Sequence, residues 1–216
     1  MIETRPHPKN QPRVKAGVRE LIETIVLALF IFLLVRSSLQ NFKVEGFSMD
    51  PTLENGEFIL VNKLIYQKVD LGPLDSLLPF VDFEDDSRFI LRAPRRGDIV
   101  VFEPNGEPGR DFIKRVIGEP GDVLEIRRGQ VFINGERLDE PYLVTQGRGN
   151  NTPVTVPTGH YFVLGDNRNN STDSRSPTIG FVSLESIVGQ ASLVYWPVDR
   201  VGIAPNEHTD TIVTAP

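Results

Sequence analysis

A serine and a lysine in two separate segments could together attack a carbonyl group. Ser48 lies in the segment Gly46-Phe-Ser-Met-Asp-Pro-Thr52, and Lys114 lies in Phe112-Ile-Lys-Arg-Val-Ile-Gly118. A neutral amine within about 3 Å of a hydroxyl can accept its proton while the oxygen attacks an acyl carbon. A serine–lysine pair is one of the alternatives to a Ser-His-Asp triad. The two residues are therefore a candidate nucleophile and a candidate general base.

The residue pattern around Lys114 favours a lowered pKa for its amine. On a strand, Lys114 would share one face with the apolar Phe112 and Val116, whereas Arg115 would lie on the other face. If the apolar face is inward, desolvation disfavours the ammonium form and lowers its pKa from about 10.4 toward neutrality. The same pattern also fits an edge-strand lysine whose stem packs while its amine reaches water.

Two other interpretations of Ser48 stay open at this point. The serine could mark an ordinary strand-to-turn junction, where Ser, Asp and Pro are common. It could also belong to a Ser-His-Asp triad, which would need His160, because His7 and His208 lie near the ends of the chain.

A third polar segment, Gly165-Asp-Asn-Arg-Asn-Asn-Ser-Thr-Asp-Ser-Arg175, follows an apolar run. Its spacing does not match a calcium loop, because Arg168 and Ser171 stand where a ligand and a glycine are needed. Asn170-Ser-Thr172 is a glycosylation sequon, a weak signal that matters only in a eukaryotic secretory route.

The composition excludes several classes of protein. The 216 residues include no cysteine, which excludes disulfides, thiol nucleophiles and cysteine-bound metals. With only three histidines, we expect no metal site and no cofactor. The net charge of −6 and the pI of about 5.2 argue against a nucleic-acid partner.

The segments that must position these residues have the patterns of strands. From residue 40 onward, short β-branched or alternating runs are separated by turns rich in glycine and proline. The predicted strands lie at 58–66, 98–102, 112–117, 123–126, 131–133, 161–164 and 191–198, and Asn134-Gly135 is a type I′ turn signal. We expect a mainly β domain over residues 40–204, with an irregular insertion at 70–92, a flexible loop at 145–155 and a flexible tail at 205–216.

The most apolar stretch of the chain, Leu21 to Val35, precedes this domain. Residues 1–19 contain five basic residues and one acidic residue, which places the N-terminus in the cytoplasm by the positive-inside rule. The uncharged core at 25–35 is shorter than the roughly 20 residues that a bilayer needs, but its flanks can extend it. We predict a basic cytoplasmic arm at 1–19 and a single transmembrane anchor at 20–39. A buried helix and a cleaved signal peptide are the alternatives, and Arg36 argues against cleavage.

Four segments in the same order resemble those of the type I signal peptidases, or leader peptidases. They are Ser48-Met-Asp-Pro-Thr52, Arg96-Gly-Asp-Ile-Val-Val-Phe102, Phe112 to Gly118 and Gly165 to Arg175. The resemblance covers roughly residues 20–200, because the apolar stretch also matches that family's anchor. The last motif is highly specific. With one span, the chain is similar to the simpler bacterial and organellar members.

The resemblance implies a β-rich catalytic core of the signal-peptidase type. It implies a membrane-bound serine endopeptidase that removes signal peptides from exported preproteins, cutting after small residues at the −1 and −3 positions. Ser48 would be the nucleophile and Lys114 the general base. Ser171 matches the serine that hydrogen-bonds and orients the lysine. Asp173 and Arg175 match a pair that braces the loop carrying that serine.

Gly46 is a departure from part of that family. Some members have a serine two residues before the nucleophile, and its hydroxyl assists the oxyanion. Here the oxyanion would rest on backbone N–H groups, chiefly that of Ser48, or on a donor that the sequence does not identify.

The partners that the resemblance implies are signal-peptide-bearing preproteins and a lipid bilayer, either plasma or thylakoid, with the catalytic domain outside the cytoplasm. The competing interpretation is an anchored, non-enzymatic β module whose polar loop binds a partner. A self-cleaving repressor-type protease with the same dyad is a second enzymatic alternative, but it would need a DNA-binding domain in place of the apolar span.

Overall fold

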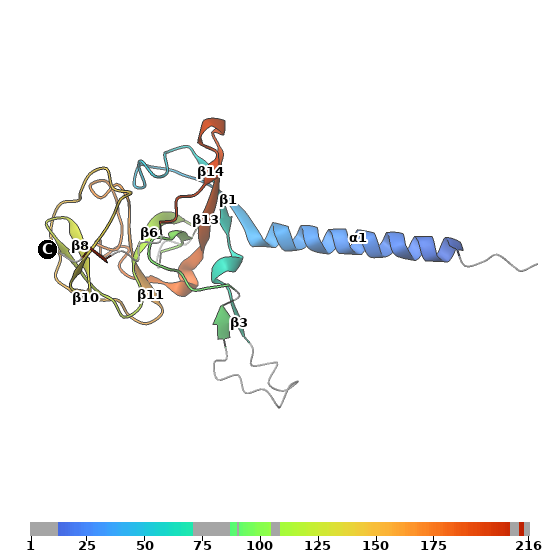
Figure 1. The fold of residues 1–216 in the computed structure, drawn as a ribbon, viewed down its shortest axis with the longest axis horizontal. Coiled ribbons are helices and arrows are strands. Elements are labelled where there is room, and N and C mark those ends of the chain that lie inside the picture. Colours follow the sequence, from blue (N-terminus) through green and yellow to red (C-terminus); the bar gives the residue numbers. More distant parts are fainter. Residues whose placement is uncertain (1–12, 71–86, 90, 105–108, 208–211, 214–216) are drawn as a thin grey trace, which may run out of the picture. The chain divides into compact units, whose positions relative to one another are not determined.

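The computed structural model describes residues 13–70, 87–89, 91–104, 109–207 and 212–213 of the chain. It is mainly β, as the sequence predicts, and Figure 1 shows its ribbon. The chain divides into two compact units, Met1–Ser38 and Leu39–Pro216. Every strand of the described part belongs to the second unit.

The described part of the first unit is one helix, α1 (Arg13–Ser38), of 26 residues. Leucine and alanine favour a helix, and the stretch contains no proline. Its large apolar side chains from Val18 to Val35 are 47% to 62% exposed. Within the residues that the structure describes, no helix combines the length and the hydropathy that crossing a membrane requires. The predicted anchor is therefore helical as far as Ser38 but is not confirmed as a membrane span.

An eight-stranded antiparallel sheet, the main sheet, forms the larger part of the second unit. Its order is β1-β2-β13-β5-β6-β11-β12, with β14 paired to β13. These strands are β1 (Leu39–Lys43), β2 (Phe58–Asn62), β5 (Ile99–Phe102), β6 (Phe112–Gly118), β11 (His160–Leu164), β12 (Val182–Ser183), β13 (Ile187–Trp196) and β14 (Gly202–Ile203). Five of the predicted runs contribute strands to it. The run at 58–66 ends in a short 3-10 helix, and two more such helices flank β13: η1 (Leu64–Tyr66), η2 (Leu184–Ser186) and η3 (Val198–Arg200).

A second sheet contains the predicted hairpins. Its order is β10-β7-β8-β9-β15, with the strands β7 (Val123–Arg127), β8 (Gln130–Ile133), β9 (Glu136–Leu138), β10 (Val154–Thr155) and β15 (Ile212–Val213). Asn134 and Gly135, between β8 and β9, have φ of 54° and 89°. A type I′ turn needs positive φ at both central positions, so the predicted turn is confirmed.

The predicted loop at 145–155 is fastened to the second sheet. The backbone N–H of Ile126 donates to Asn151 Oδ1, and the N–H of Asn151 donates back to the carbonyl oxygen of Ile126 at 3.0 Å. Val154 and Thr155 then pair with β7 as β10. The expectation of a flexible loop is wrong here, because its asparagines bind backbone groups of the neighbouring strand.

Asn206, near the end of the described residues, is hydrogen-bonded to two strands of the main sheet. Asn206 Oδ1 accepts a hydrogen bond of 2.7 Å from the N–H of Ile99 in β5, and Asn206 Nδ2 donates to the carbonyl oxygen of Ala191 in β13 at 2.8 Å. Further along, β15 pairs with β9. Within the stretch predicted as a flexible tail at 205–216, the described residues Asn206, Ile212 and Val213 thus contact strands of the two sheets.

Residues 1–12 of the arm predicted at 1–19 lie outside the described residues, as does most of the insertion predicted at 70–92. Its two ends are short strands, β3 (Lys68–Asp70) and β4 (Ser87–Phe89), which pair with each other antiparallel.

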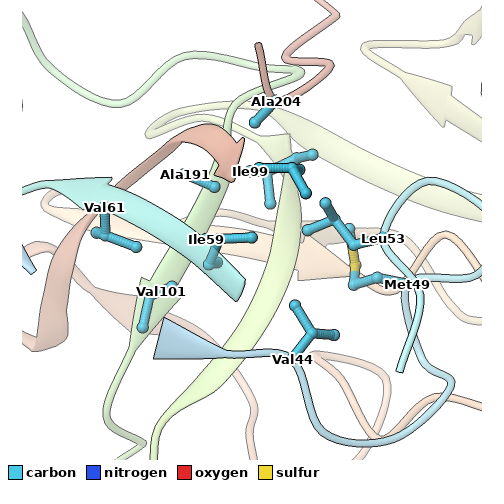
Figure 2. Packing of buried hydrophobic residues seen from close by; sticks show 10 residues of the cluster. Val44, Met49, Leu53, Ile59, Val61, Ile99, Val101, Ala191 and Ala204 are labelled. Atoms are coloured by element: carbon cyan, nitrogen blue, oxygen red, sulfur yellow. The ribbon is translucent and has the colours of Figure 1, made fainter. Parts of the chain in front are cut away.

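One cluster of buried apolar side chains connects the main sheet to the segment after β1. Figure 2 shows Met49 and Leu53 of that segment beside Ile99 of β5 and Ile59 of β2. Ile59 and Met49 are each 1% exposed, and Leu53 and Ile99 are fully buried. Truncation of such a buried leucine typically costs about 2–5 kcal/mol, so this packing fixes the segment firmly onto the sheet.

Candidate active site

Ser48 lies between β1 and β2, next to a residue that is locked in the core. Met49 points into the cluster shown in Figure 2, and the N–H of Leu53 donates to the Met49 carbonyl oxygen at 3.0 Å. This hydrogen bond closes a turn directly after the serine. Because Met49 fills the core, the neighbouring Ser48 is left partly exposed.

Lys114 reaches Ser48 from β6, a strand inside the main sheet. Its Nζ donates a hydrogen bond of 2.8 Å to Ser48 Oγ and one of 2.6 Å to the carbonyl oxygen of Ile113. The lysine is 3% exposed and stands opposite Val100 of β5. The edge-strand interpretation is wrong, because β6 is paired on both sides, with β5 and with β11.

Burial lowers the pKa of the Lys114 amine from its ordinary 10.5 to about 8. The cause is desolvation of the ammonium form, which outweighs the opposite influence of the Asp173 and Asp166 carboxylates. With this pKa, about one lysine in ten is neutral at pH 7. The expected desolvation is confirmed, and the ring of Phe112 lies 5.7 Å from Nζ.

A cavity of about 530 Å³ opens beside the two residues. Ser48 and Lys114 both line it, and apolar side chains supply much of the remaining wall: Phe42, Val44, Ile59, Val101 and Ile113. A hydroxyl next to a partly neutral amine in such a cavity can perform acyl transfer on a carbonyl group that enters it.

The polar segment 165–175 connects the end of β11 to the backbone around the serine. The N–H of Asn167 donates to the Ser48 carbonyl oxygen at 3.0 Å. Asn167 Nδ2 donates to the carbonyl oxygen of Phe47 at 2.9 Å. This loop therefore holds the peptide groups on both sides of Ser48.

Asp173 and Arg175 form the expected pair within this loop. Arg175 donates two hydrogen bonds of 2.8 Å to the Asp173 carboxylate, one from Nε and one from Nη2. The carboxylate also accepts a hydrogen bond of 3.1 Å from the N–H of Gly165. Because the Asp173 side chain is fully buried, these contacts compensate its charge and close the two ends of the loop together.

Ser171 does not make the expected hydrogen bond to Lys114. Its Oγ is buried and has no hydrogen-bond partner among the described residues. The lysine amine is engaged by Ser48 Oγ and the Ile113 carbonyl oxygen instead. Ser171 therefore lies in the predicted polar loop, but its hydroxyl makes no hydrogen bond to the described residues.

Gly46 adopts a conformation that favours glycine. Its φ is +94°, and its N–H donates to Asn55 Oδ1 at 2.9 Å. A Cβ added to Gly46 would meet no atom within 4 Å, so the backbone angle, and not crowding, requires the glycine. In the described part of the chain, the N–H of the nearby Ser48 donates to no acceptor.

His160 is not brought to the cavity. It begins β11, pairs with Ser183 of β12, and has Nδ1 3.0 Å from the carbonyl oxygen of Thr158. Among the described residues that line the cavity beside Ser48 there is no histidine, so the triad interpretation is not supported by the geometry.

The alternation of residue types along β6 did not predict that Arg115 is fully buried. Both faces of this strand are covered, and the guanidinium is paired with Asp166 by hydrogen bonds of 2.9 and 2.7 Å. The signal that could have found this pair is an arginine directly followed by the apolar Val116 and Ile117 within a predicted strand. Its partner stands 51 residues further along, where a strand pattern gives no guidance.

Comparison with known proteins was made against families, curated proteins and solved structures. Residues 18–196 match the family model described as signal peptidase, peptidase S26. The chain is 36% identical to signal peptidase I P of Bacillus subtilis subsp. natto, over 88% of this chain and 96% of that protein. It is 40% identical to the signal peptidase I of Bacillus caldolyticus, over 79% of this chain and 83% of the relative.

A cyanobacterial relative and one crystal structure extend the comparison. The chain is 36% identical to a probable signal peptidase I-2 of Synechocystis, over 87% of this chain and 78% of that protein. A crystal structure of a signal peptidase I from Enterococcus faecalis is 37% identical, with a TM-score of 0.40, over 47% of this chain and 98% of that one.

Proposed function

The chain belongs to the signal peptidase family, peptidase S26, and from this premise we propose that Ser48 and Lys114 are its nucleophile and general base. It is a serine peptidase that removes signal peptides from preproteins. The observation that carries the assignment is the 2.8 Å contact between Lys114 Nζ and Ser48 Oγ, two residues that both line the cavity.

The first half of the reaction forms an ester on Ser48. Neutral Lys114 takes the proton of the Ser48 hydroxyl while Oγ bonds to the scissile carbonyl carbon. The resulting tetrahedral oxyanion collapses, the carbon–nitrogen bond breaks, and Lys114 gives its proton to the departing amine. The acyl group of the signal peptide is then held on the serine.

The second half regenerates the enzyme. A water molecule enters, Lys114 accepts one of its protons, and the hydroxide bonds to the acyl carbon. The ester bond to Ser48 Oγ breaks, the oxygen recovers the proton from Lys114, and the signal peptide leaves with a new carboxylate. One amine thus acts as base and acid in both halves.

Two further groups complete the proposed site. The N–H of Ser48 has no acceptor in the described chain and is suited to bind the oxyanion. The buried hydroxyl of Ser171 also has no partner. We assign it the role of orienting Lys114 once that amine has left its contact with the serine.

The substrate would lie in this cavity as an extended segment. Phe42, Ile59 and Val101 supply apolar wall there. Small side chains at the −1 and −3 positions, as the family resemblance implies, would bring the scissile carbonyl to Ser48 without displacing this wall.

Two single substitutions test the dyad. Ser48→Ala and Lys114→Ala should each remove processing of a preprotein, because each takes away one partner of the proton transfer. A non-enzymatic binding module would tolerate both changes. Purified protein is incubated with a preprotein, the products are mapped by mass spectrometry, and circular dichroism checks that each variant folds. Turnover in either folded variant would refute the dyad.

We propose in addition that α1 holds the chain at a lipid bilayer, with the N-terminus on the cytoplasmic side. The proposal rests on the exposed apolar side chains of this helix, such as Leu27 and Phe30, at 58% and 62%. Contact with acyl chains would remove this surface from water, worth roughly 25 cal/mol per Å².

Vesicle experiments test the attachment and its orientation. The double change Leu27→Lys and Phe30→Lys should shift the protein from the membrane fraction to the supernatant, whereas Arg19→Lys should not. Protease added outside intact, right-side-out vesicles should degrade residues beyond 40. Protection of that region would contradict the orientation.

A further inference from the structure

A buried ion pair outside the proposed dyad holds the loop that contacts Ser48. Glu140 lies in the segment after β9, and Arg168 lies in the loop 165–175. Arg168 Nη2 donates to Glu140 Oε1, and Arg168 Nη1 donates to Glu140 Oε2 at 3.1 Å. The two side chains are 7% and 2% exposed. A bidentate pair this deeply buried fixes the direction of the arginine as well as compensating its charge.

Tyr142 connects this pair to a second buried pair. Its hydroxyl donates to Glu140 Oε1 at 2.9 Å, and its ring lies 4.0 Å from the guanidinium carbon of Arg115. Arg115 is in turn held by Asp166, with both side chains fully buried. The short segment from Glu140 to Tyr142 thus contacts both arginines.

Both arginines act on the part of the loop that binds the serine. Asp166, held by Arg115, and Arg168 are the two chain neighbours of Asn167. Arg168 Nε also donates to the carbonyl oxygen of Gly165 at 3.2 Å. Asn167 is the residue whose N–H donates to the Ser48 carbonyl oxygen at 3.0 Å. The buried pair of Glu140 and Arg168 is therefore connected, through the peptide bond from Arg168 to Asn167, to the hydrogen bond on the Ser48 carbonyl oxygen.

We propose that Glu140 and Tyr142 are positioning residues for the nucleophile. They touch neither the cavity nor the reacting atoms, and they act through Arg168 and Asn167 on the place of Ser48. A misplacement of about 1 Å can lower a rate as much as 100-fold, so a small rotation of this loop is enough to slow acylation. The inference rests on the proposed role of Ser48.

Glu140→Gln tests the proposal with little change in shape. It leaves the Arg168 guanidinium without its carboxylate, and we expect kcat to fall about tenfold while KM stays within twofold. Most of the cavity wall belongs to other elements, and the loop 165–175 contributes only Asn170 and Thr172 to it, so substrate binding should persist. Tyr142→Phe keeps the ring over Arg115 and removes one hydrogen bond, and about a threefold loss of kcat is expected.

Asp122→Asn is the matched control for a purely structural effect. Asp122 forms a half-buried pair of 2.7 Å with Arg96 and makes no contact with the loop 165–175. Asp122→Asn should lower Tm about as much as Glu140→Gln does, but it should leave kcat unchanged. Rates are measured over a temperature series that lies well below the Tm of every variant. A loss caused by misplacement persists on cooling, whereas a loss caused by partial unfolding disappears.

Parallel assays of Ser48→Ala separate the two claims. If Ser48→Ala is inactive while Glu140→Gln and Tyr142→Phe have wild-type kcat, the positioning inference is overturned and the dyad stands. A loss in Glu140→Gln that vanishes on cooling, or that Asp122→Asn shares, also overturns it. If Ser48→Ala keeps turnover, the nucleophile and the inference fail together. A persistent fall in kcat at constant KM supports the proposal.

Discussion

Gly165 lies so close to Ser171 that a Cβ built on the glycine would stand 2.2 Å from Ser171 Oγ. The same atom would lie 2.4 Å from the carbonyl oxygen of Ser48. Both distances are shorter than any normal contact, and the second involves backbone that cannot turn away. The polar loop can therefore approach the serine only because residue 165 has no side chain.

Gly165→Ala should accordingly disable the site. The added methyl group has to push either the Ser171 hydroxyl or the Ser48 peptide aside, and overpacking of this kind typically costs about 1–3 kcal/mol. We expect a lower Tm and at least a tenfold fall in kcat. Gly147→Ala is a milder comparison, since its Cβ would stand 3.0 Å from the Arg168 side chain. Wild-type kinetics in Gly165→Ala would contradict the close approach.

The pH dependence of turnover should follow the Lys114 amine. Only the deprotonated form accepts the serine proton, so kcat/KM should rise with pH on a limb with an apparent pKa near 8. Lys114→Arg should be inactive across this range, because a guanidinium does not lose its proton. The pH–rate profile of the wild type is measured beside that variant. A limb near 10.5 would mean that the amine is solvated.

Replacing the same lysine with an apolar residue should stabilise the fold at neutral pH. The folded-state pKa of Lys114, about 8, is below its ordinary 10.5. The folded chain therefore binds fewer protons than the unfolded chain between these values, and the wild type gains stability as pH rises through this window. Lys114→Met should raise the free energy of unfolding by about 1–2 kcal/mol at pH 7. Denaturant titrations should show the difference shrinking from pH 8 to 10.5, and a Met variant that is less stable at every pH would contradict this.

Ser171→Ala should separate activity from stability. The change removes a buried hydroxyl that has no partner, so the free energy of unfolding should stay constant or rise by up to about 1 kcal/mol. If the hydroxyl orients Lys114 during the reaction, kcat should fall about tenfold. Ser176→Ala, in the neighbouring turn, is the control for both measurements. Unchanged kcat in Ser171→Ala would show that the hydroxyl has no role in the reaction.

Substitutions of Gly46 should lower stability through the backbone angle and weaken substrate binding through the size of the new side chain. Any L-residue at a φ of +94° is strained by roughly 1–2 kcal/mol, so Gly46→Ala and Gly46→Val should both lower Tm. The space around the glycine is open and belongs to the cavity. Valine should therefore raise KM for a preprotein more than alanine does. Equal KM in the two variants would show that the substrate does not pass this residue.

The sequence predicted the fold class well, because the fold class depends on local patterns. Alternating apolar runs marked the strands, and the Asn134-Gly135 turn was recognisable from its two residues. Lys114 could be expected to be desolvated from its neighbours on one strand face. These inferences need only residues that lie close together in the chain. The pairing of Ser48 with Lys114 was expected from the resemblance to the family, because 66 residues separate the two in the chain.

Long-range polar pairing could not be predicted in the same way. Arg115 was expected on the strand face opposite Lys114, and its burial against Asp166 was not predicted. Glu140, which binds Arg168, lies in a segment for which no role was predicted. Ser171 was expected to bond to Lys114, but the amine has nearer acceptors. Each of these contacts joins residues that are far apart in the chain. Which residues meet is decided by the packing of the two sheets.

The hydrogen bonds of Asn206 have a consequence for how the protein is made. This side chain joins β5 to β13, and the preceding carbonyl group of Pro205 accepts a bond of 3.0 Å from Arg115, the neighbour of the lysine. Residues 205 and 206 leave the ribosome after every strand of the main sheet. The strand that carries Lys114 and its neighbour β5 therefore gain these last hydrogen bonds only after residues 205 and 206 have been synthesised.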